Sequence, residues 1–319
     1  MQPKKVLITG STGFIGRSLD ASLVINGYDV LNVIRGLDSK LSGATFVADI
    51  SPETNWRVAL IGVDIVIHSA GRVHIMNDDS INSLKEFRYS NVESTLHLAN
   101  SAVAMGVKRF IFLSSIKVLG EQSSASGKFY PDSVYNPSDP YGISKMEAEI
   151  GLQRIAKLTG LEVVIIRLPL VYGPGVKANF LSMMNWLHRG IPLPFGSVTK
   201  NRRSFVFLNN LISLIITCMS HPRAANQIFL VSDDEDLSTA VLLKRIAFAL
   251  GRPSRLIPVP VALLKLGSRL LGRSDITGRL CSSLQVDIKK TQDLLGWSPL
   301  VSVDEGLRQT AAHFLNKKS

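Results

Sequence analysis

Tyr141 and Lys145 are the two residues whose types and spacing most directly suggest chemistry. They stand four positions apart at the start of a stretch that reads as a helix, so both side chains lie on one helical face. A tyrosine with its ordinary pKa near 10 is a poor acid–base catalyst at neutral pH. A neighbouring ammonium stabilises the phenolate, and we therefore expect Lys145 to bring the pKa of Tyr141 closer to the working range.

A glycine-rich turn stands at the other end of the same half of the chain. Gly10, Gly13 and Gly16 follow the apolar run 6–9 and precede a helical stretch, residues 17–26. Glycines permit a tight turn and a close approach to a pyrophosphate, and the helix N-terminus supplies free N–H groups and its dipole. This strand–turn–helix context favours a dinucleotide site over a tight loop without a ligand.

Short apolar runs alternate with longer helical stretches around these residues. The runs are residues 5–9, 29–34, 45–48, 65–69, 109–114 and 162–168. Continuous rather than alternating hydrophobicity indicates strands covered on both faces. The expected fold is therefore α/β, with a doubly wound (Rossmann-type) parallel sheet flanked by helices.

The alternation of apolar runs and helical stretches ends after Leu168, where prolines and glycines mark a loop. The chain reads as mostly helical from Leu237 onward. We expect a dinucleotide-binding domain over residues 1–168. A strand-like segment 203–208 and a strand 227–231 suggest that residues 205–232 return to that domain. Residues 169–204 and 233–319 are expected to form a smaller, mostly helical C-terminal substrate domain, with a cleft between the two parts.

The composition is that of a globular protein, with 319 residues of which 45% are hydrophobic and 19% charged. No apolar run is long enough to cross a bilayer and no signal peptide is evident, so we expect a cytoplasmic protein. Cys218 and Cys281 lack metal-ligand spacing, so we expect reduced thiols rather than a disulfide, and no metal site. The net charge of +11 is scattered, which favours phosphate-bearing small molecules over nucleic acid as partners.

The order of these signals resembles the extended short-chain dehydrogenase/reductases, also called the NAD-dependent epimerase/dehydratase family. The resemblance begins at the Gly-x-x-Gly-x-x-Gly spacing and covers nearly the whole chain. It implies that Ser115, in Ser-Ser-Ile-Lys-Val, holds the substrate oxygen beside Tyr141, with Lys145 completing the catalytic set. It also implies a set of cofactor-binding residues. These are Gly10, Thr12, Gly13, Phe14, Ile15, Gly16, Arg35, Asp49, Ile50, Ser69, Ala70, Gly71, Asn91, Tyr141, Lys145 and Leu168.

The end of the second apolar run bears on which dinucleotide binds. Ile34 occupies the place where NAD-using relatives carry Asp, and Arg35 follows it. A guanidinium can pair with the 2′-phosphate of NADP, and Arg17 and Lys40 could add charge nearby. We therefore expect NADP(H) to be preferred, with NAD(H) possible. The alternative is that Arg35 is an ordinary solvated residue.

Three segments in the second half resemble the sugar-nucleotide branch of the family. They imply that Asn179, Arg203 and Arg279 bind the substrate, together with Ser115, Tyr141 and Lys117. Asn179 and Arg203 would contact the diphosphate of a UDP-sugar, and Arg279 is the less clear assignment. Because Lys117 follows Ser115 by two positions at a strand end, we expect both side chains to point toward the sugar. The alternative is that Lys117 turns outward to solvent.

The resemblance is nearest to enzymes that reduce the 4-keto group of UDP-2-acetamido-2,6-dideoxy-hexos-4-ulose with NADPH. Those reductases make UDP-N-acetylquinovosamine or UDP-N-acetylfucosamine for O-antigen and other surface polysaccharide. The 4,6-dehydratases of the branch carry an Asp-Glu pair where Ile116 and Lys117 stand here, so dehydration lacks its acid and base. The alternatives are a UDP-hexose 4-epimerase, acting for example on UDP-N-acetylglucosamine with bound NAD, and a non-catalytic cofactor-sensing module. A homodimer is possible in each case.

Overall fold

The computed structural model describes residues 3–36, 40–73, 83–123, 127–270 and 274–317. Seven parallel strands form the main sheet in the order β3-β2-β1-β4-β5-β6-β9. They are β1 (Lys5–Thr9), β2 (Asp29–Ile34), β3 (Ala44–Val47), β4 (Ile65–His68), β5 (Arg109–Ser115), β6 (Glu162–Leu168) and β9 (Gln227–Leu230). The prediction of a doubly wound parallel sheet is confirmed. The strand order reverses between β1 and β4, which is where such folds bind their ligands.

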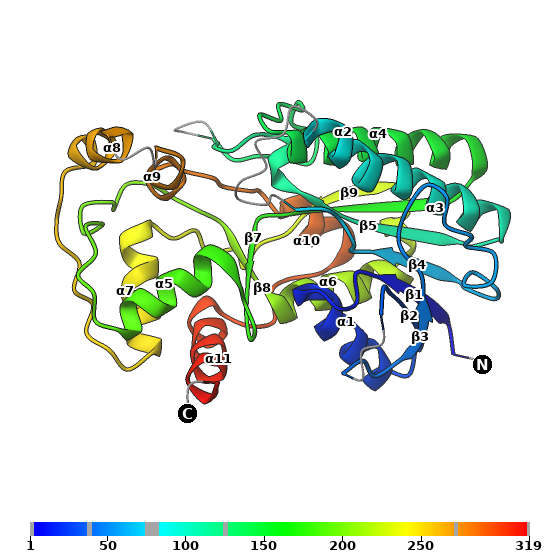
Figure 1. The fold of residues 1–319 in the computed structure, drawn as a ribbon, viewed down its shortest axis with the longest axis horizontal. Coiled ribbons are helices and arrows are strands. Elements are labelled where there is room, and N and C mark those ends of the chain that lie inside the picture. The colour runs from blue at the N-terminus through cyan, green and yellow to red at the C-terminus, as the bar shows by residue number, and fades with distance from the viewer. Residues whose placement is uncertain (1–2, 37–39, 74–82, 124–126, 271–273, 318–319) are drawn as a thin grey trace.

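Helices cover both faces of this sheet, as Figure 1 shows. On one face lie α1 (Phe14–Ile25) and α6 (Leu208–Ser220), with Leu19 and Leu211 fully buried against the strands. On the other face lie α3 (Ser94–Ala104) and α4 (Pro140–Thr159), with Leu98 and Leu152 buried. The near-continuous apolar strands are thus enclosed on both sides, as their sequence indicates.

A second sheet corrects one expectation. The segment 203–208 was expected to return to the main sheet, but β8 (Phe205–Phe207) pairs in parallel with β7 (Leu170–Tyr172), and β9 alone of these later strands joins the main sheet. Pro169 separates β6 from β7, and Phe207 packs beside Tyr172 in a second core. The boundaries proposed for the dinucleotide-binding and substrate domains stay a prediction.

The C-terminal part is mostly helical, as expected. Its core is formed by α5 (Ala178–His188), α7 (Thr239–Ala249) and α11 (Val303–Asn316), while α10 (Lys289–Leu295) packs back against β9. Two further helices, α8 (Val261–Leu270) and α9 (Ser274–Cys281), lie at the end of the molecule far from β1–β3 (Figure 1). Among the helices described, none is both long and apolar enough to cross a bilayer.

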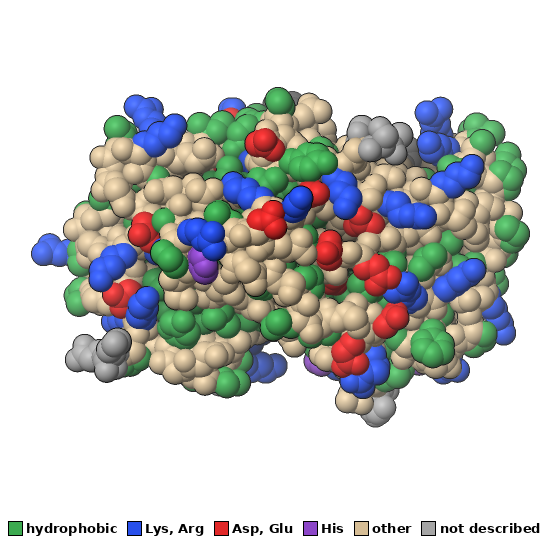
Figure 2. Space-filling view, turned by 180° about the vertical axis from the view of Figure 1, so that it is seen from behind, with side chains coloured by type: hydrophobic (Ala, Val, Ile, Leu, Met, Phe, Trp, Pro, Cys, Tyr) green, Lys and Arg blue, Asp and Glu red, His purple; other side chains and the backbone are tan. Residues whose placement is uncertain are grey.

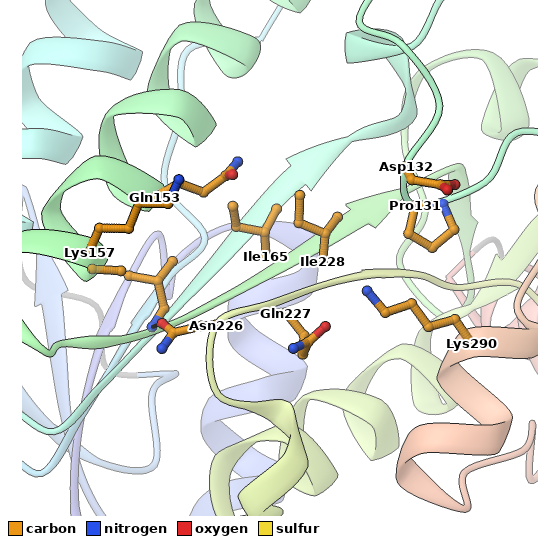
Figure 3. A pocket seen from close by; sticks show the side chains of 11 residues that line it. Pro131, Asp132, Gln153, Lys157, Ile165, Asn226, Gln227, Ile228 and Lys290 are labelled. Atoms are coloured by element: carbon orange, nitrogen blue, oxygen red, sulfur yellow. Dashed lines mark hydrogen bonds between the residues drawn. The ribbon is translucent and has the colours of Figure 1, made fainter.

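The face of the main sheet that α4 covers also has a pocket beside that helix. A pocket of about 380 Å³ lies there, with Ile165 and Ile228 of neighbouring strands β6 and β9 in its lining. Gln153 and Lys157 of α4 stand on one side of it and Lys290 of α10 on another (Figure 3). The pocket lies at the β9 edge, away from the glycine turn.

Candidate active site

The glycine turn joins β1 to α1 and has the geometry of an anion site. Gly10 adopts a φ of +74°, and a Cβ there would lie 2.7 Å from the backbone nitrogen of Ala70. A Cβ at Gly16 would lie 2.2 Å from the Gly10 carbonyl oxygen. Helix α1 begins after Gly13 with no capping side chain and no acidic residue in its first turn. Its first N–H groups are therefore available to a pyrophosphate, and this cradle fits a dinucleotide.

The residues expected at the adenosine end follow β2 and β3. Strand β2 ends on buried Ile34, and Arg35 after it is exposed. Asp49 is also exposed, and its carboxylate accepts a hydrogen bond from the backbone N–H of Ile50 at 3.0 Å, so it caps its own turn. Arg35 is therefore placed to meet a 2′-phosphate. Its exposure also agrees with the alternative, in which Arg35 is an ordinary solvated surface residue.

The loop after β4 is fixed to β1 on one side. The Ser69 hydroxyl donates to the Thr9 carbonyl oxygen at 2.6 Å, and the Ala70 N–H donates to the Thr9 hydroxyl at 3.4 Å. A Cβ at Gly71 would come within 3.3 Å of the Lys145 ammonium. The loop predicted to pass along the cofactor therefore lies directly against Lys145, one of the predicted catalytic residues.

Asn91 connects this loop to α4. It lies in a π-helical turn, η1 (Tyr89–Glu93), that joins α2 (Ser83–Arg88) to α3, and it is buried. Its side-chain amide donates to the Arg72 carbonyl and to the Ser144 hydroxyl, both at 3.0 Å, and its oxygen accepts from the Arg72 N–H at 2.8 Å. The Ser144 hydroxyl in turn donates to the Tyr141 carbonyl at 2.8 Å. Asn91 thus braces the first turn of α4.

His68, at the end of β4, is a buried structural residue. The Thr95 hydroxyl donates to the Asn91 carbonyl and so must accept from His68 Nε2–H at 2.9 Å, while Thr9 donates to Nδ1 at 2.7 Å. Burial, and then the charge of Lys145, lowers the pKa of His68 to about 3. The ring is therefore neutral at physiological pH.

Ser115, Tyr141 and Lys145 meet where β5 ends and α4 begins. Ser115 is the last residue of β5, and Asp139 caps α4 by accepting a hydrogen bond from the Gly142 N–H at 2.6 Å. The Ser115 side chain lowers the pKa of the Tyr141 hydroxyl, so the two groups are near each other. The Lys145 ammonium donates to the Leu113 carbonyl at 3.0 Å and lies 4.4 Å from the centre of the Phe112 ring. The sequence prediction that these three residues come together fits this geometry.

The expected lowering of the Tyr141 pKa is not what the structure favours. Burial raises the pKa of Tyr141 to about 12, the Ser115 side chain lowers it in part, and the charge of Asp139 raises it. Burial also lowers the pKa of Lys145 to about 8, against the opposite effect of Glu149. Desolvation disfavours both charged forms, and it is the largest cause of both shifts. A bound oxidised nicotinamide would bring the further positive charge that favours a phenolate.

Lys117 does not lie on a strand, which corrects the argument for its orientation. Strand β5 ends at Ser115, and Lys117 lies in a 3₁₀ turn, η2 (Ile116–Val118), whose cap is the Ser115 side chain. The Lys117 ammonium pairs with Asp139 and, at 3.0 Å, with Glu121. It is therefore neither solvated freely nor available as an unpaired cation beside a sugar.

The structure brings together Arg203 and Arg279, two of the residues predicted to bind the substrate. The Arg203 guanidinium donates to the Arg279 carbonyl at 2.7 Å and to the Ser282 carbonyl at 3.3 Å. Burial, and then the charge of Arg279, lowers the pKa of Arg203 to about 10. Two neighbouring guanidinium groups repel each other and favour an anion between or beside them. Asn179 lies exposed in the first turn of α5, and its place at the substrate stays a prediction.

Sequence reasoning missed a buried ion pair close to the predicted catalytic residues. Glu149 and Arg167 pair at 2.8 Å with side chains 0% and 1% exposed. Glu149 also accepts hydrogen bonds from the hydroxyls of Ser114 at 2.5 Å and Tyr135 at 2.8 Å. An arginine inside the apolar strand β6 was the available signal, because a buried charge needs a partner.

The glycine turn, the Ser–Tyr–Lys arrangement and the parallel sheet together fit a nicotinamide dinucleotide site on a doubly wound fold. The chain belongs to the NAD dependent epimerase/dehydratase family, whose model matches residues 6–232. It is an enzyme of this family, and the family uses nicotinamide cofactors.

A UDP-glucose 4-epimerase of Vibrio cholerae is 48% identical over 315 residues, covering 98% of this chain and 96% of that protein. The fold also matches a UDP-glucose 4-epimerase from Thermotoga maritima, solved with UDP-glucose, with a TM-score of 0.79 and 24% identity over 99% of this chain and 100% of that one. It matches RMD from Pseudomonas aeruginosa, solved with NADPH, with a TM-score of 0.77 and 20% identity over 98% and 99%. At these identities the two structures show the fold alone.

Proposed function

We propose that this chain is a UDP-hexose 4-epimerase that works with a bound nicotinamide dinucleotide. The observation that carries the proposal is the 48% identity to the Vibrio cholerae 4-epimerase over nearly the whole of both chains. This relative favours the epimerase alternative over the keto-sugar reductase to which the sequence motifs pointed first.

The catalytic residues serve a reversible proton transfer at the 4-oxygen of the sugar. A bound dinucleotide would supply the hydride acceptor for C4 and the source from which the hydride is returned to the opposite face of the ring. As the C4 hydride leaves, the Tyr141 Oη takes the proton of the C4 hydroxyl, and the Ser115 hydroxyl holds that oxygen. After the keto sugar has turned, Tyr141 gives the proton back.

Lys145 and Asn91 support this proton transfer through their effects on Tyr141. The Lys145 ammonium stabilises the phenolate form of Tyr141, and Asn91 fixes the α4 turn that carries Tyr141 through Ser144. Arg203 and Arg279 bind the UDP diphosphate, far from the reacting carbon, and so orient the ring. A 4,6-dehydration is disfavoured because Ile116 is buried and Lys117 is held by two carboxylates.

An NADPH-dependent 4-ketoreductase is the second candidate. It is favoured by exposed Arg35 directly after β2 and by Ile34 at the place of the usual acid, which together suit a 2′-phosphate. A reductase needs a soluble, exchanging cofactor, whereas an epimerase regenerates the one it holds.

One experiment separates the two candidates. The purified protein is incubated without added cofactor with UDP-glucose or UDP-N-acetylglucosamine, and separately with NADPH and UDP-2-acetamido-2,6-dideoxy-hexos-4-ulose, and the sugars are followed by NMR. Interconversion of the C4 epimers without net NADPH oxidation is the expected result. Stoichiometric NADPH oxidation with no interconversion would overturn the epimerase and leave the reductase.

A further inference from the structure

Helix α8 exposes an apolar face at the outer end of the C-terminal part. Leu263, Leu266 and Leu270 are 58%, 56% and 80% exposed, and their spacing places them on one side of the helix. Of the residues described in α8, Ser268 is the buried one. Single exposed leucines are ordinary on a protein surface, but three on one face of a ten-residue helix form a patch.

Cations flank this face. Lys265 and Arg269 are exposed, and at about 100° per residue they lie roughly 110° around the helix from the leucines. The sequence from 252 to 285 holds six Lys or Arg residues and one acidic residue, against 36 and 25 in the whole chain. In the view from behind, the end of the molecule that carries α8 shows blue and green side chains and little red (Figure 2).

We propose that α8 docks on an anionic lipid bilayer surface, lying in the plane of the interface. Leucines that enter the boundary between headgroups and acyl chains, with lysine and arginine beside them for the lipid phosphates, are the pattern of such helices. At ten residues α8 is too short to span the bilayer. The charge excess argues against a second copy of this chain as the occupant. Two α8 helices facing each other across a two-fold axis would bring Lys265 and Arg269 near their own copies.

The docking surface adjoins the substrate side of the molecule. Helix α8 packs against α9, which carries Arg279, the neighbour of Arg203. The bilayer would therefore lie beside the C-terminal part. None of the three leucines belongs to the catalytic or substrate-binding residues.

Vesicle co-sedimentation tests the proposal with the full-length protein. Vesicles of phosphatidylcholine alone are compared with vesicles of phosphatidylcholine and phosphatidylglycerol, at low and at raised salt. We expect binding to the anionic vesicles, weaker at raised salt, and a loss of about ten-fold or more in the variant Leu263→Ser/Leu266→Ser/Leu270→Ser. Lys265→Gln/Arg269→Gln should lose the preference for anionic lipid.

The matched control is Phe248→Ser/Leu300→Ser, which removes two apolar side chains that are 88% and 74% exposed outside α8. It should bind vesicles as the parent does, and all variants should keep the parent's turnover of soluble substrate. Absence of vesicle binding by the parent overturns the proposal, as does equal loss in the control. A leucine variant that instead changes the oligomeric state in sedimentation velocity, with no vesicle binding by the parent, identifies a second copy as the occupant.

Discussion

Glu149→Gln tests whether the buried ion pair supports catalysis as well as folding. The substitution keeps the shape of the side chain but removes a charge that is fully enclosed and pairs with Arg167. Arg167 would keep its hydrogen bond to the Pro131 carbonyl at 2.9 Å, but its charge would stay buried without a carboxylate.

The effect on stability follows from that burial. Removing one partner of a buried pair costs about 3–5 kcal/mol, out of a total near 5–15 kcal/mol. At about 2–4 °C per kcal/mol, the melting temperature should fall by roughly 6–20 °C. The double variant Glu149→Gln/Arg167→Met leaves no unpaired charge and should recover much of that loss.

The substitution should also change the pH dependence of catalysis. Burial lowers the pKa of Lys145 to about 8, and the Glu149 carboxylate acts against this. Without that carboxylate the Lys145 pKa falls further, so the ammonium is lost at a lower pH. The alkaline limb of the kcat profile should therefore move to lower pH in both variants, with KM for the sugar nucleotide unchanged.

Calorimetry and kcat measured across pH check these outcomes. Glu147→Gln is the matched control, because Glu147 is on the same helix but pairs with Arg88 at the surface at 2.6 Å. It should leave both readouts close to those of the parent. A Glu149→Gln protein with the parent's melting temperature and the parent's alkaline limb of the kcat profile would refute the role assigned to the Glu149–Arg167 pair.

Three further substitutions test the site. Tyr141→Phe should lower kcat by about 10²–10⁴ with dinucleotide affinity retained in a fluorescence titration; turnover within a few-fold of the parent would mean another proton carrier. Arg35→Asp should reverse a preference for NADP(H) over NAD(H) in the same titration, because a carboxylate repels the 2′-phosphate; a parent that binds NAD(H) as tightly would contradict the assignment of Arg35. Arg203→Ala should raise KM for the UDP-sugar by about 10–100-fold, since a charge-assisted contact contributes about 1.5–3 kcal/mol, and a defect confined to the dinucleotide would show that Arg203 is placed wrongly.

The local features of the site could be predicted from the sequence. Strands β1, β2 and β6 have the bounds expected from their apolar runs, and the glycine turn follows β1 as its spacing indicates. Tyr141 and Lys145 share a helical face because that relation depends on residues four apart. Such features are fixed by neighbours in the chain.

The contacts between distant segments could not be predicted in the same way. Arg167 follows Glu149 by 18 positions, and their pairing depends on how α4 packs on β6. The orientation of Lys117 was wrongly argued, because the chain leaves the strand for a 3₁₀ turn at Ile116. The pKa of Tyr141 was expected to fall because Lys145 was visible in the sequence, whereas the burial that raises it was not.

The π turn at Asn91 is where this helix can change in length by one residue. The Ser94 N–H bonds to the Tyr89 carbonyl five residues back, so the turn holds one more residue than an α turn. Because the turn itself takes up that extra residue, deleting one codon here would restore α geometry. The backbone around Asn91 would then shift, and its side chain would lose the position from which it contacts Arg72 and Ser144. Relatives one residue shorter at this point should therefore brace the first turn of α4 by other contacts.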